Sequence, residues 1–514
     1  MSDRFIYDII DYPGSARPQT HPDNLCAIAR LHGIQAASPA RCHYLEVGCG
    51  DAANLLPLAL AYPDSRFVGM DLSETAIARG EAFRRELGLD NLRLEVADLG
   101  RWAPPDEPFD YISAHGFYSW VPAEVRDALL QLCADRLAAN GIAYVSYNAL
   151  PGCRLRQMVW DMLRAHVSRF DDPATRLEQG YAMLRLLEKG IIGDETYAQA
   201  VRDEVARLLE RTPPSVLFHD DLAGINTPVS ITEFAAHAGR FGLGFLAEAD
   251  YREMNENIAP EPVAQMLRNA AQENILLKEQ YLDFFKIRRF RQTLLCRDSL
   301  RPSLLPDPAV VGALSVQGAI NCDGPVDLAS DAHSGFSNDQ GSRFQVNAPV
   351  LKAAMLILDE RYPACIGFDD LLASARARAG ASSDADADML RQTLLMIFLV
   401  GVVHLRADPP RYTDRAGERP LASPLVRAQL RAGGEQVTSL QPSTIVLEDP
   451  MLRTMMRLMD GSRDRNTLLS DLAEAMAAGD AEGGRDAAGW RSHLEARFDG
   501  NLANAAKIGL LMGH

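Results

Sequence analysis

Short apolar runs alternate with helical patterns over the first 148 residues of the chain. Apolar stretches at positions 44–47, 66–70, 92–96, 111–112 and 143–146 have the length and composition of buried strands. Helices are predicted from position 54 to just before 62, from Ser73 to Gly88, and over 123–138, with Ser73 as an N-cap. This alternation predicts an α/β fold in which helices cover both faces of a parallel sheet.

The middle of the chain is predicted to leave the sheet and return to it. Residues 155–211 carry apolar stripes at helical spacing, and the pair Pro213-Pro214 ends them. Residues 215–218 and 244–248 are predicted strands on either side of a helix at 230–241, which makes the helical block an insertion. Residues 262–297 are again predicted to be helical.

The last third of the chain has weaker patterns. Residues 323–341 are rich in Asp, Ser and Gly, which is typical of a long loop or linker. Residues 352–405 carry three helical patterns followed by an apolar run, consistent with a small winged-helix unit. Residues 438–477 predict a strand and two helices, and residues 479–489 are expected to have little regular structure.

The strongest chemical signal is the run EVGCGD at positions 46–51, where a strand turns into a helix. Its glycines allow a tight turn and let a ligand lie against the main chain. A dinucleotide would require a third glycine where Ala53 stands, and the carboxylates of Glu46 and Asp51 would repel its pyrophosphate. The same carboxylates would favour an ammonium or sulfonium ligand. A tight turn without any ligand is the alternative.

Two further acids close the next two predicted strands. Asp71 lies about 20 residues after the glycines, the position of an acid that accepts hydrogen bonds from ribose hydroxyls. Asp98 closes the third strand and could accept a hydrogen bond from an exocyclic amine. Each could equally cap a helix. Together with Glu46 they place three acids along one strand-end edge, where open α/β sheets bind ligands.

With these residues, the block 44–148 resembles the class I S-adenosylmethionine-dependent methyltransferases. The resemblance implies a Rossmann-like sheet, with S-adenosylmethionine as cofactor and S-adenosylhomocysteine as product. It also implies that Gly48 and Gly50 pack against the methionine end of the cofactor, although the family has a glycine where this chain has Ala52. The cofactor-binding residues expected on this basis are Glu46, Gly48, Cys49, Gly50, Asp51, Asn54, Asp71, Leu72, Asp98, Leu99 and His115.

The resemblance can be narrowed to bacterial methyltransferases that carry a methyltransferase regulatory domain. The core segments that support it are 12–13, 19–22, 54–57, 114–122, 146–148 and 151–152. Segments 218–220 to 246–248 and 279–283 to 291–295 resemble the regulatory domain, and segments 419–425 and 459–465 resemble the C-terminal part of the same proteins. This architecture is similar to that of bacterial lysine methyltransferases that act on outer-membrane proteins.

The expected organisation follows from the patterns and the resemblance together. It comprises an N-terminal cap segment (1–40), an S-adenosylmethionine-binding core (41–154), a helical insertion (155–213), a regulatory domain that completes the sheet (214–300), a linker (301–345) and a C-terminal winged-helix-like domain (346–514).

The methyl acceptor is expected near the ends of the fourth and fifth strands. His115 could act as a general base or be a loop histidine that only donates and accepts hydrogen bonds. Aromatic side chains there could hold an alkylammonium by cation–π attraction, or could pack the rim of the sheet. Asn148 lacks the N-P-P-Y context of enzymes that methylate planar nitrogens. The candidate catalytic residues are His115, Tyr118 and Tyr147, and the candidate substrate contacts are Tyr12, Trp120 and Asn148.

Composition and charge narrow the partners. The 514-residue chain has 52 Lys+Arg against 69 Asp+Glu, a formal net charge of -17, which disfavours nucleic-acid binding. The basic run at 286–291 is therefore interpreted as a solvated helix face or a domain contact. Eight cysteines without a C-x-x-C pair predict neither disulfides nor a metal site. The longest apolar run, 394–403, is half the roughly 20 residues that cross a bilayer. With no signal peptide apparent, a cytoplasmic location is expected.

The sequence thus predicts a methyltransferase that transfers methyl groups to protein lysine amines. Two alternatives stay open: methylation of a small-molecule amine or hydroxyl, and a cofactor-binding regulator without catalysis. The expected partners are a protein substrate or a small acceptor, without nucleic acid or membrane insertion, and a homodimer is left open.

Overall fold

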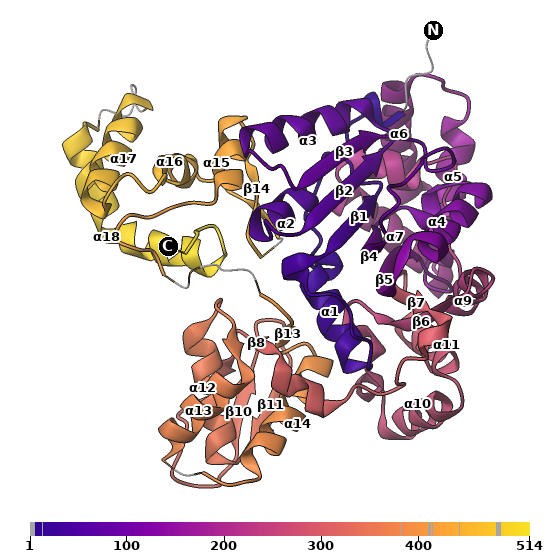
Figure 1. The fold of residues 1–514 in the computed structure, drawn as a ribbon. Coiled ribbons are helices and arrows are strands. Elements are labelled where there is room, and N and C mark those ends of the chain that lie inside the picture. The colour runs from indigo at the N-terminus through magenta and orange to yellow at the C-terminus, as the bar shows by residue number, and fades with distance from the viewer. Residues whose placement is uncertain are drawn as a thin grey trace.

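The computed structural model describes residues 6–12, 14–380, 382–409, 413, 415–441, 443–479 and 485–513. Within these ranges seven strands form one sheet in the order β3-β2-β1-β4-β5-β7-β6 (Figure 1). β1 to β5 run parallel, and β7 lies antiparallel between β5 and β6. The predicted α/β sheet is confirmed. Its strands are β1 (His43–Val47), β2 (Arg66–Asp71), β3 (Leu92–Val96), β4 (Phe109–Ala114), β5 (Leu137–Asn148), β6 (Leu243–Glu248) and β7 (Phe290–Arg297).

Helices cover both faces of this sheet, because successive side chains of a strand point to opposite sides. Tyr44 packs into a core with α1 (Pro22–Leu31), α2 (Leu55–Ala61) and α3 (Glu74–Glu86). Its neighbour Leu45 packs into a second core with α4 (Ala123–Arg136) and α9 (Ile231–Gly239). Every residue of β1 is buried, which explains why its apolar residues do not alternate with exposed polar ones.

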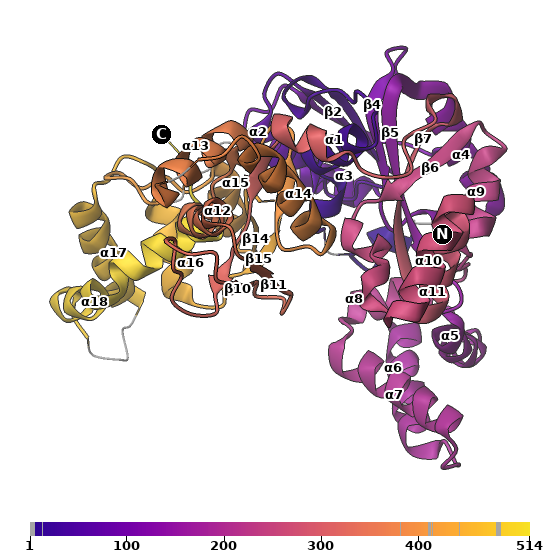
Figure 2. The ribbon, with the colours of Figure 1, turned by 90° about the horizontal axis from the view of Figure 1, so that it is seen from below.

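The helical insertion is confirmed and consists of α5 (Arg154–Val167), α6 (Pro173–Gly190) and α7 (Thr196–Arg211). These helices bury Val159, Leu184 and Val205 in a hydrophobic core of their own. Figure 2 shows α6 and α7 projecting away from the sheet.

The prediction of a strand at 215–218 is wrong. These residues form α8 (Pro214–Val216) and the π-helical turn η5 (Leu217–Asp221). Pro214 occupies the first position of a helical turn, where its missing N–H costs nothing. Leu217 and Phe218 are then buried against the insertion helices rather than the sheet. The short apolar run therefore reflects burial, but not strand pairing.

The prediction of continuous helix over 262–297 is correct for α10 (Glu261–Glu273) and α11 (Ile275–Lys286) and wrong for the last eight residues. Ile287, with φ of 47°, takes the left-handed conformation and ends α11. The chain then enters the gap between β5 and β6 as β7, which forms hydrogen bonds on both sides. The helix at 230–241 and the strand at 244–248 are confirmed as α9 and β6.

The stretch 323–341, expected as a loop, contains a strand. β10 pairs with β9 and β11, and its single large apolar residue, Phe336, is too little to show a strand periodicity in the sequence. The three helices predicted over 352–405 are confirmed, and the apolar run after them leads into a short strand, β13. The elements are β8 (Ser315–Gln317), β9 (Asn321–Cys322), β10 (Ser334–Ser337), β11 (Arg343–Val346), α12 (Pro349–Arg361), β12 (Ile366–Gly367), α13 (Phe368–Ala379), α14 (Asp386–Leu399) and β13 (His404–Arg406).

The remaining elements form a separate hydrophobic core. They are α15 (Pro424–Arg431), β14 (Gln436–Thr438), β15 (Thr444–Val446), α16 (Pro450–Leu458), α17 (Arg465–Gly479) and α18 (Ala487–Lys507). Residues 346–514, expected as one domain, thus contribute to two cores, in a middle unit (301–409) and a C-terminal unit (415–513). Pro13 and part of the stretch 479–489 lie outside the described residues.

Candidate functional site

The glycine-rich turn after β1 has the backbone geometry that the sequence predicts. Gly48 and Gly50 have φ values of 73° and 54°, in the region that side chains disfavour. A Cβ added at Gly50 would meet no atom within 4 Å, so the main chain there faces open space. Ala52 has φ of 59° and is fully buried, so alanine here bears a strain that glycine would avoid. The turn thus exposes backbone to a ligand at the carboxyl end of β1.

Glu46 lies beneath this turn, and only one of its two carboxyl oxygens has a hydrogen-bond partner among the described residues. The side chain is 4% exposed, and its Oε1 accepts a hydrogen bond of 3.1 Å from Asn54 Nδ2. Its Oε2 is buried and, among the described residues, has no hydrogen-bond partner. Burial raises the pKa of Glu46 to about 8, and the charges of Asp71 and Asp51 add to this rise. An ammonium group next to Oε2 would supply the missing partner.

Asp71 holds the turn to the end of β2. Its two carboxylate oxygens accept hydrogen bonds from the backbone N–H groups of Gly50, at 2.9 Å, and Ser73, at 2.8 Å. Asp51 accepts a hydrogen bond from the N–H of Ala53. Burial raises the pKa of both aspartates. The carboxyl ends of β1 and β2 therefore bring Glu46, Asp51 and Asp71 together, as predicted for adjacent parallel strands.

The other expected cofactor residues lie around these acids. Asp98, beyond the end of β3, is more exposed than Asp71, and its carboxylate accepts a hydrogen bond from the N–H of Gly100. Leu72 is 46% exposed and offers an apolar surface beside Asp71, while Leu99 packs partly against the core. Cys49 is buried, and burial raises the pKa of its thiol, so the thiol remains protonated.

The N-terminal segment passes over the glycine turn. A Cβ at Gly14 would lie 1.9 Å from the carboxylate of Asp51, so the Gly14 main chain approaches the Asp51 side chain more closely than a side chain at position 14 would allow. The N–H of Arg17 donates to Asn54 Oδ1 at 2.9 Å, and Asp8 accepts a hydrogen bond from the hydroxyl of Ser73. Hydrophobic periodicity does not predict this contact, because single residues far apart in the chain form it.

His115 lies at the end of β4, with its Nδ1 2.8 Å from the hydroxyl of Tyr144. Burial lowers its pKa to about 3, and the positive charge of Arg17 lowers it further. The imidazole is therefore neutral at physiological pH and is a weak proton acceptor. This favours the alternative in which His115 forms hydrogen bonds over its role as general base.

Tyr118 and Tyr147 are not brought to the candidate site, which corrects the expectation that they are catalytic. The hydroxyl of Tyr118 forms a hydrogen bond with His237, and that of Tyr147 forms one with Thr293. Both rings pack against Phe234 in the core beneath α9, and both are less than 5% exposed. Since side chains alternate along a strand, Tyr147 and Asn148 point to opposite sides. The two tyrosines therefore pack the sheet.

A cavity of about 200 Å³ opens at the carboxyl end of β5. Two of the predicted substrate contacts line it, Trp120 and Asn148. The third, Tyr12, lies nearby, with its ring 5.6 Å from that of His219. The full lining consists of Trp120, Asn148, Cys153, Arg156, Trp160, Asp220, Asn226, Arg289 and Phe290.

This cavity adjoins the acidic edge of the sheet, which is formed by Glu46, Asp51 and Asp71 at the carboxyl ends of β1 and β2. The ring of Phe290, in its wall, lies 5.7 Å from that of His115. Tyr7 of the N-terminal segment is close enough to both Asp220 and Asp71 for each of their charges to raise its pKa. A ligand on the acidic edge and a second molecule in the cavity could thus meet near His115. Parallel α/β sheets bind their ligands at this end of the strands.

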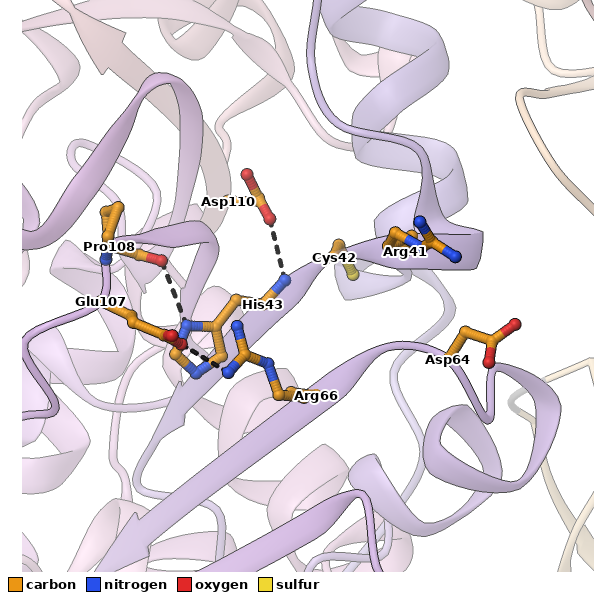
Figure 3. Close-up of a pocket in the computed structure, with 8 residues that line it drawn as sticks. All are labelled: Arg41, Cys42, His43, Asp64, Arg66, Glu107, Pro108 and Asp110. Atoms are coloured by element: carbon orange, nitrogen blue, oxygen red, sulfur yellow. Dashed lines mark hydrogen bonds and ion pairs between the residues drawn. The ribbon is translucent and has the colours of Figure 1, made fainter.

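A second depression lies at the opposite end of the strands, where β1 and β2 begin (Figure 3). It has a volume of about 310 Å³, and its charged groups are largely paired. Arg66 forms an ion pair of 2.5 Å with Glu107, and the N–H of His43 donates to Asp110. Because it lies at the amino ends of the strands, we do not assign the site to it.

Several residues of the cavity were not predicted as site residues. Arg156 and Trp160 come from α5, and Asp220 and Asn226 lie in and just after η5. They come from the insertion and the regulatory region, far from the glycine turn in sequence. The signals for Asp220 were the adjacent aspartates in the run FHDD at 218–221, just after the predicted strand at 215–218, and the resemblance of 218–220 to the regulatory domain.

The described residues also lack a metal site and a membrane-spanning helix. No group of three or more His, Cys, Asp or Glu side chains there is arranged to bind a metal ion. None of the described helices combines the length and apolarity needed to cross a bilayer.

Known families match three parts of the chain. Residues 45–141 match a methyltransferase domain, and residues 213–297 match a domain described as a predicted methyltransferase regulatory domain. Residues 418–507 match the C-terminal winged helix domain of PKMT. The last match gives the C-terminal unit its fold, which the sequence had predicted only as winged-helix-like.

Among similar proteins, the uncharacterized protein RP789 of Rickettsia prowazekii is 35% identical over 302 residues, which are 59% of this chain and 54% of that protein. The chain therefore spans about half the length of this relative. The uncharacterized protein RP028 of the same organism is 32% identical over 238 residues, which are 46% of this chain and 95% of that protein.

A solved structure shares the fold of nearly the whole chain. PKMT2 from Rickettsia typhi, in complex with AdoHcy, has a TM-score of 0.85 and 24% sequence identity. The superposition covers 98% of this chain and 100% of that one. From the matching domains, the 32% identity over nearly all of RP028 and the common fold, we conclude that this chain belongs to the class I S-adenosylmethionine-dependent methyltransferases that carry a methyltransferase regulatory domain.

Proposed function

We propose that this protein transfers methyl groups from S-adenosylmethionine to the side-chain amines of protein lysines. One observation carries the proposal: an acidic edge with an unsatisfied buried carboxylate oxygen adjoins a cavity lined by aromatic rings and a carboxyl group. The edge suits a cationic nucleoside, and the cavity suits an alkylammonium. Both lie at the carboxyl end of the sheet, the edge at β1 and β2 and the cavity at β5, with β4 between them.

The residues of the edge fit the cofactor. Bound S-adenosylmethionine supplies a methyl group on a positively charged sulfonium. The free Oε2 of Glu46 would accept a hydrogen bond from the cofactor's ammonium, and the glycine turn would approach its methionine part. Asp71 would accept from the ribose hydroxyls and Asp98 from the adenine amine, with Leu72 against the base. The acids would hold this cation through hydrogen bonds to charged groups, worth about 1.5–3 kcal/mol each.

The cavity supports an amine as acceptor. Trp120, Trp160 and Phe290 provide faces on which an alkylammonium is attracted by the ring quadrupole. Together these walls would align the amine with the methyl group and exclude water, the two contributions that a displacement of this kind needs most.

The names of the relatives agree with a protein acceptor. We read PKMT, which names both the winged helix domain and the Rickettsia typhi structure, as protein lysine methyltransferase. Transferred to this chain, that name favours protein lysines over a small-molecule acceptor. The middle and C-terminal units would then help to bind the protein substrate.

The proposal can be tested with methyl-labelled S-adenosylmethionine and a bacterial lysate. We expect the label in the protein fraction, on methyllysines identified by mass spectrometry after digestion. Asp71→Ala should weaken cofactor binding by at least about tenfold. Asp90→Ala, at an exposed loop aspartate, serves as the matched control and should leave binding unchanged.

Each alternative has its own outcome. Label that enters only low-mass compounds would replace the protein acceptor by a small molecule. Cofactor binding without transfer of label would favour a regulator without catalysis. Failure of the unmodified protein to bind S-adenosylmethionine would contradict the proposal altogether.

A further inference from the structure

Two adjacent aspartates in the π-helical turn η5 have opposite surroundings. The carboxylate of Asp221 is fully buried and accepts two hydrogen bonds from Arg156, at 2.8 and 2.9 Å. It also accepts one of 2.5 Å from the indole N–H of Trp160. Asp220 lines the cavity, and its carboxyl takes part in no hydrogen bond or ion pair with the described residues. The wide turn of a π-helix aims the two side chains differently, an arrangement common at functional sites.

The main chain of Asp220 is held in place from the sheet. Asn226 Nδ2 donates to the carbonyl oxygen of Asp220 at 3.0 Å. Asn148, at the end of β5, donates through its Nδ2 to Asn226 Oδ1 at 2.8 Å. All three residues line the cavity, so a hydrogen-bonded chain connects Asp220 to the strand end that faces the methyl donor. A carboxyl group without a partner, carried on a main chain that is held in place, is suited to a ligand.

The two arginines of the cavity wall do not serve as its partner. Arg156 is committed to Asp221 through two hydrogen bonds, which leaves the charge of this pair balanced. Arg289 forms an ion pair of 2.7 Å with Glu204. Another wall residue, Trp120, also has an unused polar group: its indole N–H is buried and has no hydrogen-bond partner among the described residues. The cavity therefore offers a carboxylate for a cation, aromatic faces for its alkyl chain, and one spare donor.

We propose that Asp220 binds the ammonium group of the acceptor and accepts its proton before methyl transfer. This rests on the proposed function, and assigns to one residue the deprotonation that an amine acceptor requires. Asp220 would then be a catalytic residue that the sequence alone did not single out.

The step balances in atoms and charge. The acceptor R–NH₃⁺ gives one proton to the Asp220 carboxylate and becomes R–NH₂ with a free lone pair. The lone pair forms an N–C bond to the methyl carbon as the C–S bond breaks, and the electrons of that bond pass to the sulfur. The products are R–NH₂⁺–CH₃ and the uncharged thioether S-adenosylhomocysteine. The proton on Asp220 then leaves to solvent.

The groups that face Asp220 are consistent with this role. Burial and the charge of Asp221 raise its pKa to about 7, whereas Arg156 and Arg17 lower it. The carboxyl is thus ionised in part at neutral pH and accepts a proton readily. Burial, together with Asp220, raises the pKa of the nearby Tyr7 and Tyr12. Both tyrosines therefore stay protonated at neutral pH and cannot accept the proton in place of Asp220.

The first test uses n-butylammonium as a probe of the cavity, with and without S-adenosylhomocysteine, by titration calorimetry. The probe stays cationic between pH 6 and 8.5, so we expect its affinity to rise with pH as Asp220 ionises. Asp220→Asn should weaken binding by about tenfold or more and remove the pH dependence. Asp161→Asn, at an exposed aspartate on α5, the helix that supplies Arg156 to the cavity, is the matched control and should behave like the unmodified protein.

The outcomes separate this inference from the proposed function. Loss of S-adenosylhomocysteine binding in the unmodified protein would contradict the proposed function, whatever the probe does. Equal probe binding by the unmodified protein and Asp220→Asn, or no probe binding at all, would overturn the role of Asp220. If Asp220→Asn does not fold, by circular dichroism, a pH-independent affinity of the unmodified protein for the probe would overturn it instead.

A kinetic test follows with methyl transfer to poly-L-lysine. We expect Asp220→Asn to lower kcat by about 100-fold at pH 7 and to recover partly at pH 10, where the free amine forms without a base. Asp220→Glu, which keeps a carboxyl group, should recover more activity at pH 7 than Asp220→Asn. An unchanged pH profile in Asp220→Asn would contradict proton transfer to this residue.

Discussion

At the scale of single residues, the candidate site depends on carboxyl groups that are buried without a complete set of partners. Glu46 has one paired and one unpaired oxygen, and Asp220 has no partner for its carboxyl among the described residues. Burial raises the pKa of both toward neutrality. An ionised carboxylate in such a place costs folding free energy, and a cationic ligand offsets this cost. We therefore expect the free protein to be less stable than it would be with uncharged side chains at these two positions.

This cost predicts the behaviour of Glu46→Gln. The pKa of Glu46 is about 8 in the folded chain, against 4.5 for an unperturbed glutamate. Its contribution to stability is fully present below pH 4.5 and is lost as pH rises through 8, because the unfolded chain ionises first. Glu46→Gln should thus be more stable than the unmodified protein by about 1–3 kcal/mol at pH 8.5 and no more stable at pH 4. Urea unfolding at the two pH values measures the difference.

The same substitution should weaken S-adenosylmethionine binding by about tenfold or more, since glutamine offers no charge to the ligand's ammonium. The matched control is Glu178→Gln, at an exposed position on α6, for which we expect no change in stability or affinity. A Glu46→Gln variant that lost stability at pH 8.5 would contradict this account of the site.

At the scale of elements, β7 is anchored to α11 and β6 by a buried ionic cluster around Arg291. The guanidinium is fully buried and contacts Glu248 at 2.6 Å, Glu279 at 3.1 Å and Asp283 at 2.9 Å. Glu248 also accepts a hydrogen bond from Thr293, whose hydroxyl bonds to that of Tyr147 on β5. The cluster therefore connects the regulatory region to the strand whose end forms the cavity.

Arg291→Met should destabilise the protein by about 3–5 kcal/mol, because three buried carboxyl groups lose their shared cation. The loss should be smaller at pH 5, where carboxyl groups left without the cation can take up protons. The free energy of unfolding in urea at pH 7.5 and pH 5 checks both statements. Arg268→Met, which breaks the surface ion pair with Glu261 on α10, should cost less than about 1 kcal/mol. Equal losses for the two variants would show that the cluster does not anchor β7.

At the scale of the whole molecule, α1 connects the sheet to the middle unit. Asp23, fully buried on α1, accepts hydrogen bonds from the backbone N–H groups of Ala407, at 2.5 Å, and Asp408, at 2.8 Å. The hydroxyl of Tyr62 donates to the carbonyl oxygen of Asp408 at 2.8 Å. The hydrophobic core is continuous from α1 to β13, so the sheet and the middle unit are packed as one body (Figure 1).

Asp23→Ala should therefore loosen the middle unit and leave the sheet intact. We expect faster amide hydrogen exchange over residues 404–409 and in α1, with a loss of about 1–3 kcal/mol in stability, since two buried N–H groups lose their acceptor. Hydrogen exchange with mass spectrometry locates the effect. Glu86→Ala, which breaks the exposed ion pair to Arg431 between α3 and α15, is the control and should change neither. Faster exchange in β1 to β5 would contradict the expectation that Asp23→Ala leaves the sheet intact.

The predictions from sequence succeeded where the residues that meet are close together in the chain. The glycine turn, Glu46, Asp51 and Asp71 belong to two adjacent βα units, so the parallel order of β1 and β2 was enough to bring them together. Prediction failed where the partner lies far away in sequence. Residues 290–297 were predicted as helix and became β7, because the gap between β5 and β6 is filled only in the folded sheet. Tyr147 looked like a site residue, yet its side of β5 faces the core.

The sequence by itself determined the fold class, the glycine turn and the acids of the cofactor edge. The reason is that apolar periodicity, glycine conformation and strand ends are local properties of the chain. Tertiary structure alone decided the acceptor side. Trp160 comes from the helical insertion, and Asp220 and Asn226 come from the regulatory region. They meet Asn148 only because these segments fold back on β5. Burial then sets the pKa of Asp220, and burial is a property of the assembled fold.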